Sequence, residues 1–304
     1  MRILVVAPNW IGDALMAQPL FARLKGEIDV IAPEWVAPVM RRMPEVRSVI
    51  STPFVHGPLQ LQQRWKLGRQ IKGQYDQAYV LPNSWKSALI PFFAGIPRRT
   101  GYVGEARYGL LNDARKATGA SMAAHYAALA GDGPLSQPRL RVSAEEIEQA
   151  KRKFGVAGRY AVLCPGAEYG PAKRWPYFSD LSRKITLPVV VLGSEKDRQP
   201  GIGGTDLTGR TTLDEAILLL AGAQFVVSND SGLMHVAAAL ARPQVALFGS
   251  SSPEHTPPQS AAARVLWLRI ECSPCYQREC PLGHFRCMKE MTVEMVVDQL
   301  KTVS

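Results

Sequence analysis

Short apolar runs that alternate with longer helical patterns constrain the fold of this chain most. The first run, Ile-Leu-Val-Val-Ala at 3–7, precedes a helical pattern from about 13 to 25. A strand that is apolar at every position is covered on both faces, which is typical of a parallel sheet between helices. The chain is therefore predicted to be an α/β protein. Further strand candidates lie at 28–32, 78–81, 160–164, 189–192, 225–228 and 245–248.

The alternating pattern is interrupted once, near the middle of the chain. Residues 131–138 are rich in Gly, Pro and Ser, and a charged helical segment follows before the strands restart. Because 304 residues suffice for about two domains, we predict Rossmann-like domains over 1–150 and 151–304 with a cleft between them.

Residues 193–205, which link two predicted strands, are too few for a full crossover helix. Helical patterns lie at 36–43, 59–72, 84–94, 213–221 and 233–240, and from about 176.

Positive charge is concentrated in the first half. Residues 1–130 carry 16 Lys and Arg against 8 Asp and Glu, within a net charge of +10. This predicts an acidic partner, such as nucleic acid, anionic lipid or a phosphorylated glycan. The absence of a nucleic-acid recognition motif and of interleaved aromatic and basic residues argues against nucleic acid. No apolar run spans a bilayer and no cleavable signal is evident, so we expect a cytoplasmic protein.

The loop after the first strand carries a candidate general base. Asn-Trp-Ile-Gly-Asp at 9–13 lies at the carboxyl edge of the predicted sheet, where open parallel sheets bind ligands. The loop lacks the Gly-x-Gly-x-x-Gly spacing of dinucleotide-binding domains. Asp13 could accept a proton from an incoming hydroxyl group. The alternative is that Asp13 only caps its helix.

A strand-to-helix junction in the second half predicts a phosphate site. Ser-Asn-Asp-Ser-Gly at 228–232 ends a strand and begins a helix, so the backbone N–H groups there could bind a pyrophosphate. Asp230 is anionic and would instead orient a sugar hydroxyl or cap the helix. His235 is either a donor in the site or a buried core histidine.

A basic segment follows another strand on the same predicted sheet edge. Lys173 or Arg174, within Pro-Ala-Lys-Arg-Trp-Pro at 171–176, could neutralise phosphate charge in place of a divalent ion. The alternative is that this Lys-Arg pair is only solvated.

Four of the five cysteines lie within sixteen residues, at Cys272, Cys275, Cys280 and Cys287. Their density predicts a closed structural metal site, with zinc as the default ion and His284 as a possible substitute ligand. An iron–sulfur cluster uses the same ligands, and four unmetallated thiols are the remaining alternative. Cys164 lies in a strand and is predicted to be a buried apolar residue.

Several blocks together resemble the ADP-heptose:lipopolysaccharide heptosyltransferases. Leu-Pro-Asn-Ser at 81–84 and Arg-Tyr-Gly-Leu-Leu-Asn-Asp at 107–113 are similar to the type II members, and the similarity extends to about Pro258. The other blocks lie at 9–13, 79–80, 92–97, 165–168, 170–176 and 229–240.

The resemblance implies a GT-B fold, with the acceptor in the N-terminal domain and ADP-heptose in the C-terminal domain. It also implies an inverting, metal-independent transfer of L-glycero-D-manno-heptose to the first heptose of the lipopolysaccharide inner core. The acceptor would be heptosyl-Kdo2-lipid A, reached by peripheral contact with the anionic inner-membrane surface. A nucleotide-sugar epimerase of GT-B fold and a basic nucleic-acid-binding protein are the alternative functions.

The resemblance also implies a role for each matching residue. The roles are general base for Asp13, donor phosphate and sugar contact for Lys173, pyrophosphate binding for Ser231 and Gly232, heptose contact for Asp230, support of that site for His235, and ribose contact for Glu195.

Overall fold

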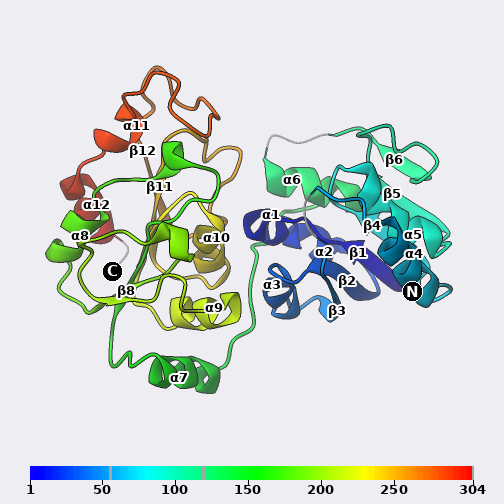
Figure 1. Ribbon diagram of the computed structural model, residues 1–304, viewed down its shortest axis with the longest axis horizontal. Helices are drawn as coiled ribbons and strands as arrows, with labels where there is room; N and C mark the ends of the chain where they lie inside the picture. Colours follow the sequence, from blue (N-terminus) through cyan, green and yellow to red (C-terminus); the bar gives the residue numbers. More distant parts are fainter. Residues whose placement is uncertain (55–56, 118–120, 303–304) are drawn as a thin grey trace. The chain divides into compact units, whose positions relative to one another are not determined.

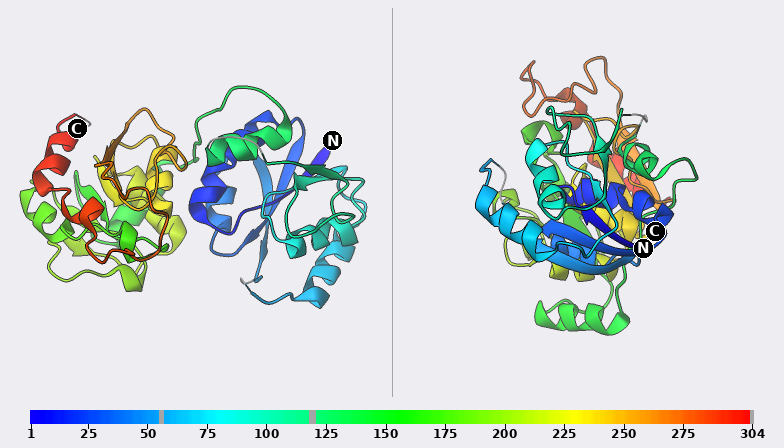
Figure 2. Two further views of the ribbon diagram at one scale, coloured as in Figure 1. Left: turned by 90° about the horizontal axis from the view of Figure 1, so that it is seen from above. Right: turned by 90° about the vertical axis from the view of Figure 1, so that its right-hand side faces the viewer.

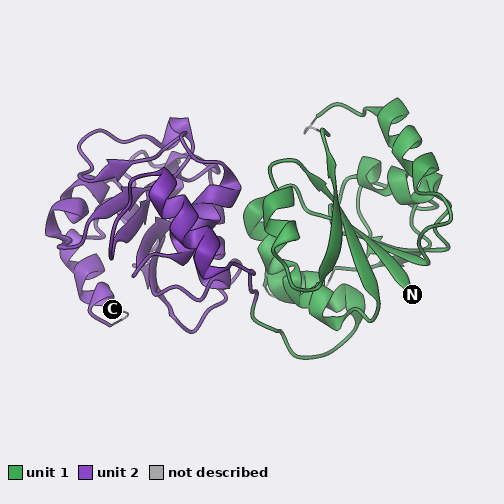
Figure 3. Ribbon diagram, turned by 90° about the horizontal axis from the view of Figure 1, so that it is seen from below, with its two compact units in different colours: residues 1–137 green, residues 138–304 purple. Residues whose placement is uncertain are grey.

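The computed structural model describes residues 1–54, 57–117 and 121–302 and divides the chain into two compact units, Met1–Gln137 and Pro138–Ser304 (Figure 3). The charged segment after the division forms α7 (Ala144–Lys153), which packs on α9 (Leu213–Ala221) of the second unit. The second unit therefore begins ahead of residue 150, where the sequence places the division. None of the helices in the described ranges combines the length and apolar character needed to cross a bilayer.

A six-stranded parallel sheet forms the first unit. Its order is β3-β2-β1-β4-β5-β6, so the chain turns back across β1 after the third strand. Right-handed crossovers therefore place the helices that link β1, β2 and β3 on one face of the sheet and the helices that link β3, β4 and β5 on the other. The strands are β1 (Arg2–Val6), β2 (Glu27–Pro33), β3 (Val46–Thr52), β4 (Gln77–Val80), β5 (Arg98–Tyr102) and β6 (Asp113–Arg115).

Helices cover both faces of this sheet (Figures 1 and 2). The first-face helices are α1 (Ile11–Met16), α2 (Gln18–Arg23), α3 (Ala37–Arg41) and α6 (Met122–Ala127), and those of the second face are α4 (Leu61–Gln70) and α5 (Leu89–Phe93). The single helix predicted at 13–25 is wrong, because α1 ends before Ala17 and α2 begins beside Pro19, which has no N–H to continue the hydrogen-bonding pattern. The sequence also misses β3, β5 and β6, whose positions are partly exposed and polar.

The second unit repeats this architecture in the order β12-β11-β10-β7-β8-β9. Helices α8 and α12 cover one face, and α9 and α10 cover the other (Figure 1). The strands are β7 (Ala161–Cys164), β8 (Val189–Val191), β9 (Thr205–Asp206), β10 (Val226–Asn229), β11 (Gln244–Phe248) and β12 (Ala263–Trp267). The remaining helices are α8 (Phe178–Lys184), α10 (Gly232–Ala239), α11 (Arg286–Lys289) and α12 (Val293–Leu300), with short 3-10 turns η3 (Pro171–Lys173) and η4 (Glu195–Asp197).

The link between β8 and β9 is trimmed, as the sequence predicts. Only the turn η4 lies between these two parallel strands, with no α-helix in this described segment. The edge of the second sheet is therefore built from two short strands and a loop.

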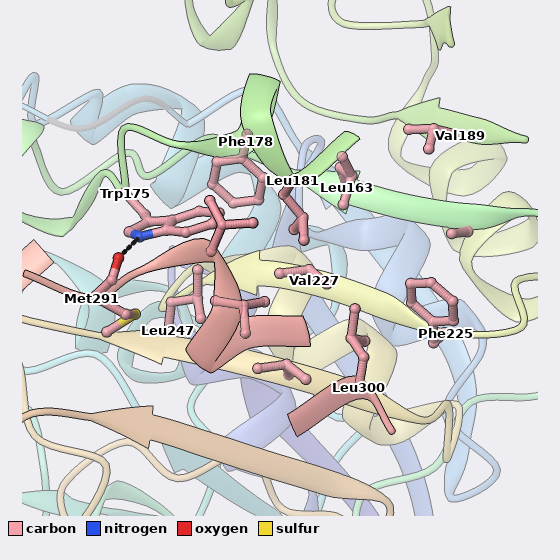
Figure 4. Close-up of a cluster of buried hydrophobic side chains, with 14 of the residues drawn as sticks. Leu163, Trp175, Phe178, Leu181, Val189, Phe225, Val227, Leu247, Met291 and Leu300 are labelled. Carbon is pink, nitrogen blue, oxygen red and sulfur yellow. Dashed lines mark hydrogen bonds between the residues drawn. The ribbon is translucent and has the colours of Figure 1, made fainter. Parts of the chain in front are cut away.

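Trp175 is the largest fully buried side chain of the second unit. Its ring packs edge-on against Phe178 at a centroid distance of 5.2 Å, and its indole Nε1 donates to the carbonyl oxygen of Met291 at 2.8 Å (Figure 4). This bond joins the segment after β7 to the turn between α11 and α12. Trp175 thus anchors one end of the segment that carries Lys173.

We expect Trp175→Phe to lower the free energy of unfolding by roughly 2–4 kcal/mol, because it leaves a buried carbonyl unpaired and opens a void. Tyr177→Phe is a matched control, since the Tyr177 hydroxyl donates to the Lys289 carbonyl at an exposed position. Loss of this hydrogen bond should lower the free energy of unfolding by less than about 1 kcal/mol. Chemical denaturation of both variants measures the difference, and equal losses would contradict the anchoring role of Trp175.

Candidate functional site

The carboxyl ends of β7 and β10 form the switch point of the second sheet. These neighbouring strands are parallel, and the chain runs outward from β7 on one side and from β10 on the other. Ligands of open α/β sheets bind outside the strand ends at such a point. Both predicted donor segments begin here.

The side chain of Asn229, at the end of β10, ties these segments together. Its Nδ2 donates to the carbonyl oxygen of Pro165 at 2.7 Å, and its Oδ1 accepts from the backbone N–H of Trp175 at 3.1 Å. Asn229 is fully buried, so both amide groups are used where water could not replace them. The loop after β7 is thereby fixed at its beginning and its end.

Lys173 and Asp230 meet between these segments. The Lys173 ammonium lies 2.5 Å from Asp230 Oδ2, and the side chains are only 14% and 5% exposed. The hydroxyl of Ser251, after β11, donates to the same carboxylate oxygen at 2.5 Å. Lys173 is therefore not a solvated surface lysine, and its remaining N–H groups are available for a further acceptor. Ser251 stands in a run of three serines that gave no sequence signal.

The N-terminus of α10 begins immediately after Asp230. Ser231 is the N-cap residue with extended backbone and no side-chain capping bond, and Gly232 is the first helical residue. Asp230 therefore does not cap this helix. The first N–H groups of a helix have no partner within the helix, and the helix dipole adds positive potential there. The junction combines these N–H groups with the Lys173 cation.

His235 lies in the interior beneath this junction. Burial lowers its pKa to about 4, an effect that Asp230 opposes and Lys173 reinforces. The ring is therefore neutral near pH 7. His235 is thus a buried residue, as one of the two interpretations of the sequence has it, and it interacts electrostatically with the Lys173–Asp230 pair.

Glu195 lies apart from this pair in its hydrogen bonding. It begins η4 after β8, and its exposed carboxylate pairs with the Arg198 guanidinium at 2.9 Å. The side-chain bonds with Arg198 lower its pKa. Within the described ranges, no hydrogen bond or ion pair joins Glu195 to Lys173 or Asp230.

Asp13 lies at the corresponding strand end of the first unit. Helix α1 begins at Ile11 with Trp10 as its N-cap residue, so Asp13 is in the first turn and the N-cap interpretation is wrong. Its side chain is half-buried, and its charge adds to burial in raising the pKa of Tyr126 on α6. A partly buried carboxylate near a strand end can accept a proton.

A pocket opens at the same edge of the first sheet. It is lined by strand-end residues together with Arg64, Lys86 and Asn9. Arg64 is only 6% exposed. Its guanidinium group stacks on the Phe54 ring at 4.3 Å and donates to the Leu59 carbonyl. Among the described residues, no carboxylate forms an ion pair with it. Neither Arg64 nor Lys86 lies in a distinctive spacing, so the sequence gives no signal for them.

The four clustered cysteines surround a second, smaller pocket. Cys272, Cys275, Cys280, Cys287 and His284 all line it, and burial followed by the charges of the other three thiols raises the pKa of Cys287 to about 11. Among the residues that the structure describes, no three His, Cys, Asp or Glu side chains are already arranged as a metal-binding group. Cys164 is buried in β7, as predicted.

The chain resembles known proteins over its full length. Residues 64–286 match the profile of glycosyltransferase family 9 (heptosyltransferase). Lipopolysaccharide heptosyltransferase 2 of Escherichia coli is 42% identical, with 100% of this chain and 98% of that protein aligned. Lipooligosaccharide heptosyltransferase 2 of Haemophilus ducreyi is 40% identical, with 99% and 98% aligned.

A solved structure agrees with these sequences. The E. coli ADP-heptose lipopolysaccharide heptosyltransferase II superposes with a TM-score of 0.88 at 40% identity, covering 100% of this chain and 98% of that one. The two parallel sheets with their helices match its GT-B architecture, which confirms the predicted fold class. The chain belongs to glycosyltransferase family 9, the heptosyltransferases, and is a glycosyltransferase.

Proposed function

We propose that this chain transfers L-glycero-D-manno-heptose, with inversion, from ADP-heptose to the first heptose of heptosyl-Kdo2-lipid A. As a heptosyltransferase, it acts in assembly of the lipopolysaccharide inner core. The observation that carries the donor assignment is the Lys173–Asp230 pair beside the uncapped start of α10. A buried cation and free N–H groups at one point suit a pyrophosphate better than an uncharged ligand.

In this proposal the donor's charge is neutralised by the protein. Ser231 and Gly232 donate backbone N–H groups to the pyrophosphate, and Lys173 contacts phosphate and sugar oxygens. Asp230 accepts a hydrogen bond from a hydroxyl of the transferred heptose and stays paired with Lys173. The neutral His235, buried beneath this pair, helps to keep the Asp230 carboxylate in position. These fixed charges stabilise the departing ADP, so the reaction needs no divalent ion.

Asp13 completes the reaction as general base. The acceptor hydroxyl transfers its proton to the Asp13 carboxylate, its oxygen forms the bond to the anomeric carbon, and the bond from that carbon to the ADP oxygen breaks. Attack opposite the leaving group inverts the configuration. The half-buried position of Asp13 in the first turn of α1 supports this role.

The pocket of the first unit suits the acceptor. Kdo carboxylates and inner-core phosphates are anionic, and Arg64 is a buried guanidinium with planar donors for such groups. The excess of Lys and Arg in the first half favours peripheral contact with an anionic surface at the cytoplasmic face of the inner membrane.

Two further assignments complete the proposal. Glu195 would accept hydrogen bonds from the ribose hydroxyls of the donor and give up part of its hydrogen bonding with Arg198. Cys272, Cys275, Cys280 and Cys287 would hold a structural zinc ion outside the reaction, because a four-thiolate shell leaves no open position for substrate.

The acceptor assignment predicts ADP release from ADP-heptose only with an acceptor that ends in the first heptose. An acceptor that ends in Kdo should give the background rate, since it lacks the nucleophilic hydroxyl. Mass spectrometry of the lipid product checks for one added heptose. Equal rates with the two acceptors, or epimerised donor without transfer, would refute the assignment.

Asp13→Asn should lower the transfer rate at least about 100-fold and leave ADP affinity near that of the wild type, because it removes the proton acceptor alone. Asp76→Asn is the matched control, since Asp76 precedes β4 at the opposite edge of the same sheet and accepts from the backbone of Arg2. A residual rate within about threefold of wild type, a barrier change below roughly 0.7 kcal/mol, would exclude general-base catalysis by Asp13.

Lys173→Ala should weaken ADP-heptose binding and slow transfer together. Lys184→Ala removes the same charge from an exposed side chain of α8 and should change neither. Lys173→Arg retains the charge but not the compact ammonium group and should recover only part of the activity. Calorimetric titration and an ADP-release assay with and without EDTA provide the measurements. An absolute requirement for a divalent ion would show that Lys173 is not the main source of charge compensation.

A further inference from the structure

The cysteine segment, residues 272–287, is bonded directly to the loop that carries Lys173. The Ala172 N–H donates to the Arg278 carbonyl at 3.1 Å, and the Arg278 Nε donates to the Tyr169 carbonyl at 2.7 Å. The Tyr169 hydroxyl donates in turn to the Tyr276 carbonyl at 2.6 Å. The residue immediately before Lys173 therefore takes its position from the cysteine segment.

Gly170 allows this close approach. A Cβ at Gly170 would lie 2.4 Å from the Arg278 carbonyl oxygen, and its φ of +149° disfavours other residues. The aromatic ring of Tyr169 lies between the two segments, 4.8 Å from the Lys173 ammonium and 5.6 Å from the Arg278 guanidinium. The contact is thus built into the loop and is not an incidental surface approach.

The same segment also contacts the loop that carries Ser251. The Tyr276 N–H donates to the Ser250 carbonyl at 2.7 Å, and the Ser273 hydroxyl donates to the Gly249 carbonyl at 2.6 Å. Because Ser251 bonds Asp230, the cysteine segment supports both neighbours of the Lys173–Asp230 pair.

Little within the cysteine segment holds it in shape. Residues 271–285 form neither helix nor strand in the described chain, and the side chains of Tyr276 and Leu282 are exposed. A loop of this length with so little buried apolar surface needs a cross-link to be rigid. The four thiols are the groups available to supply one.

The pocket between the thiols has the size and lining of a single-ion site. Its volume is about 20 Å³, which is room for one water-sized body such as a single ion. The Phe285 N–H already donates to Cys280 Sγ at 3.4 Å, the kind of bond that orients a thiolate ligand. The Ser250 hydroxyl also lines the pocket, is 1% exposed, and has no hydrogen-bond partner among the described residues, so it could donate to a thiolate.

We propose that one zinc ion bound by Cys272, Cys275, Cys280 and Cys287 clamps the cysteine segment and thereby positions Lys173 and Ser251 around Asp230. The thiols would rotate inward from their places on the pocket wall to reach zinc–sulfur distances of about 2.3 Å. The ion does not contact the donor. Its binding affects donor affinity through Ala172 and Ser250, which form walls shared by the thiol pocket and the donor loops.

Elemental analysis and ADP titration of untagged protein, purified without chelator, test the clamp. Wild type should contain about one equivalent of zinc. Cys275→Ser should lose the zinc and weaken ADP binding about tenfold. Cys275→His keeps a zinc ligand at the same position and should retain both the zinc and the ADP affinity of the wild type. It is the decisive variant if Cys275→Ser does not fold. Cys164→Ala removes the one cysteine outside the cluster and should change neither.

Two results would overturn the proposal. Less than about a tenth of an equivalent of zinc in the wild type would show that the segment binds no ion. Loss of zinc with unchanged ADP affinity would show that the ion does not position the donor loops. The effect on ADP binding rests on the donor site proposed above, whereas zinc content does not. Zinc in a protein that fails to transfer heptose would therefore refute the proposed function and leave the metal site standing.

Discussion

The hydrogen bonds of the Asn229 side chain hold the proposed donor site together. An amide both donates and accepts, so a single buried residue at the end of β10 fixes the start and the end of the loop after β7. Aspartate could accept from Trp175 but could not donate to Pro165, and leucine could do neither. Because this loop is fixed at both ends, Lys173 meets a carboxylate that belongs to a different strand.

Lys173 and Asp230 form an ion pair of opposite charges that is almost completely buried. The ammonium group and the carboxylate are each other's hydrogen-bonded partner, so neither is buried without an opposite charge beside it. The Ser251 hydroxyl adds a bond to the carboxylate. The neutral His235 beneath them avoids a second cation in the same small volume. The Lys173 ammonium and the N-terminus of α10 therefore bring positive potential to one point at the strand ends, which suits the proposed phosphate site.

The sequence predicts most of this arrangement because parallel strands bring their carboxyl ends to one edge. Lys173 and Asp230 follow different strands, and strand adjacency makes them neighbours. The sequence could not predict Ser251, whose importance depends on the register of β11 beside β10. It also missed the break at Ala17, which depends on Pro19 within an otherwise helical pattern, and the polar edge strands. The contact between residues 169–172 and the cysteine segment lies between distant parts of the chain and has no local signal.

The trimmed link between β8 and β9 bears on the order in which the second unit folds. Pairing of residues such as Val190 and Thr205 closes only a short loop, whereas pairing of Val162 with Val226 must close a much longer one. Loop-closure entropy delays contacts between distant residues, so the β8–β9 edge can form before β10 joins β7. The proposed donor site lies at the junction of β7 and β10, which forms late. A nascent chain would thus acquire affinity for nucleotide only when its central strands have paired, and bound ADP would report completed folding of this unit.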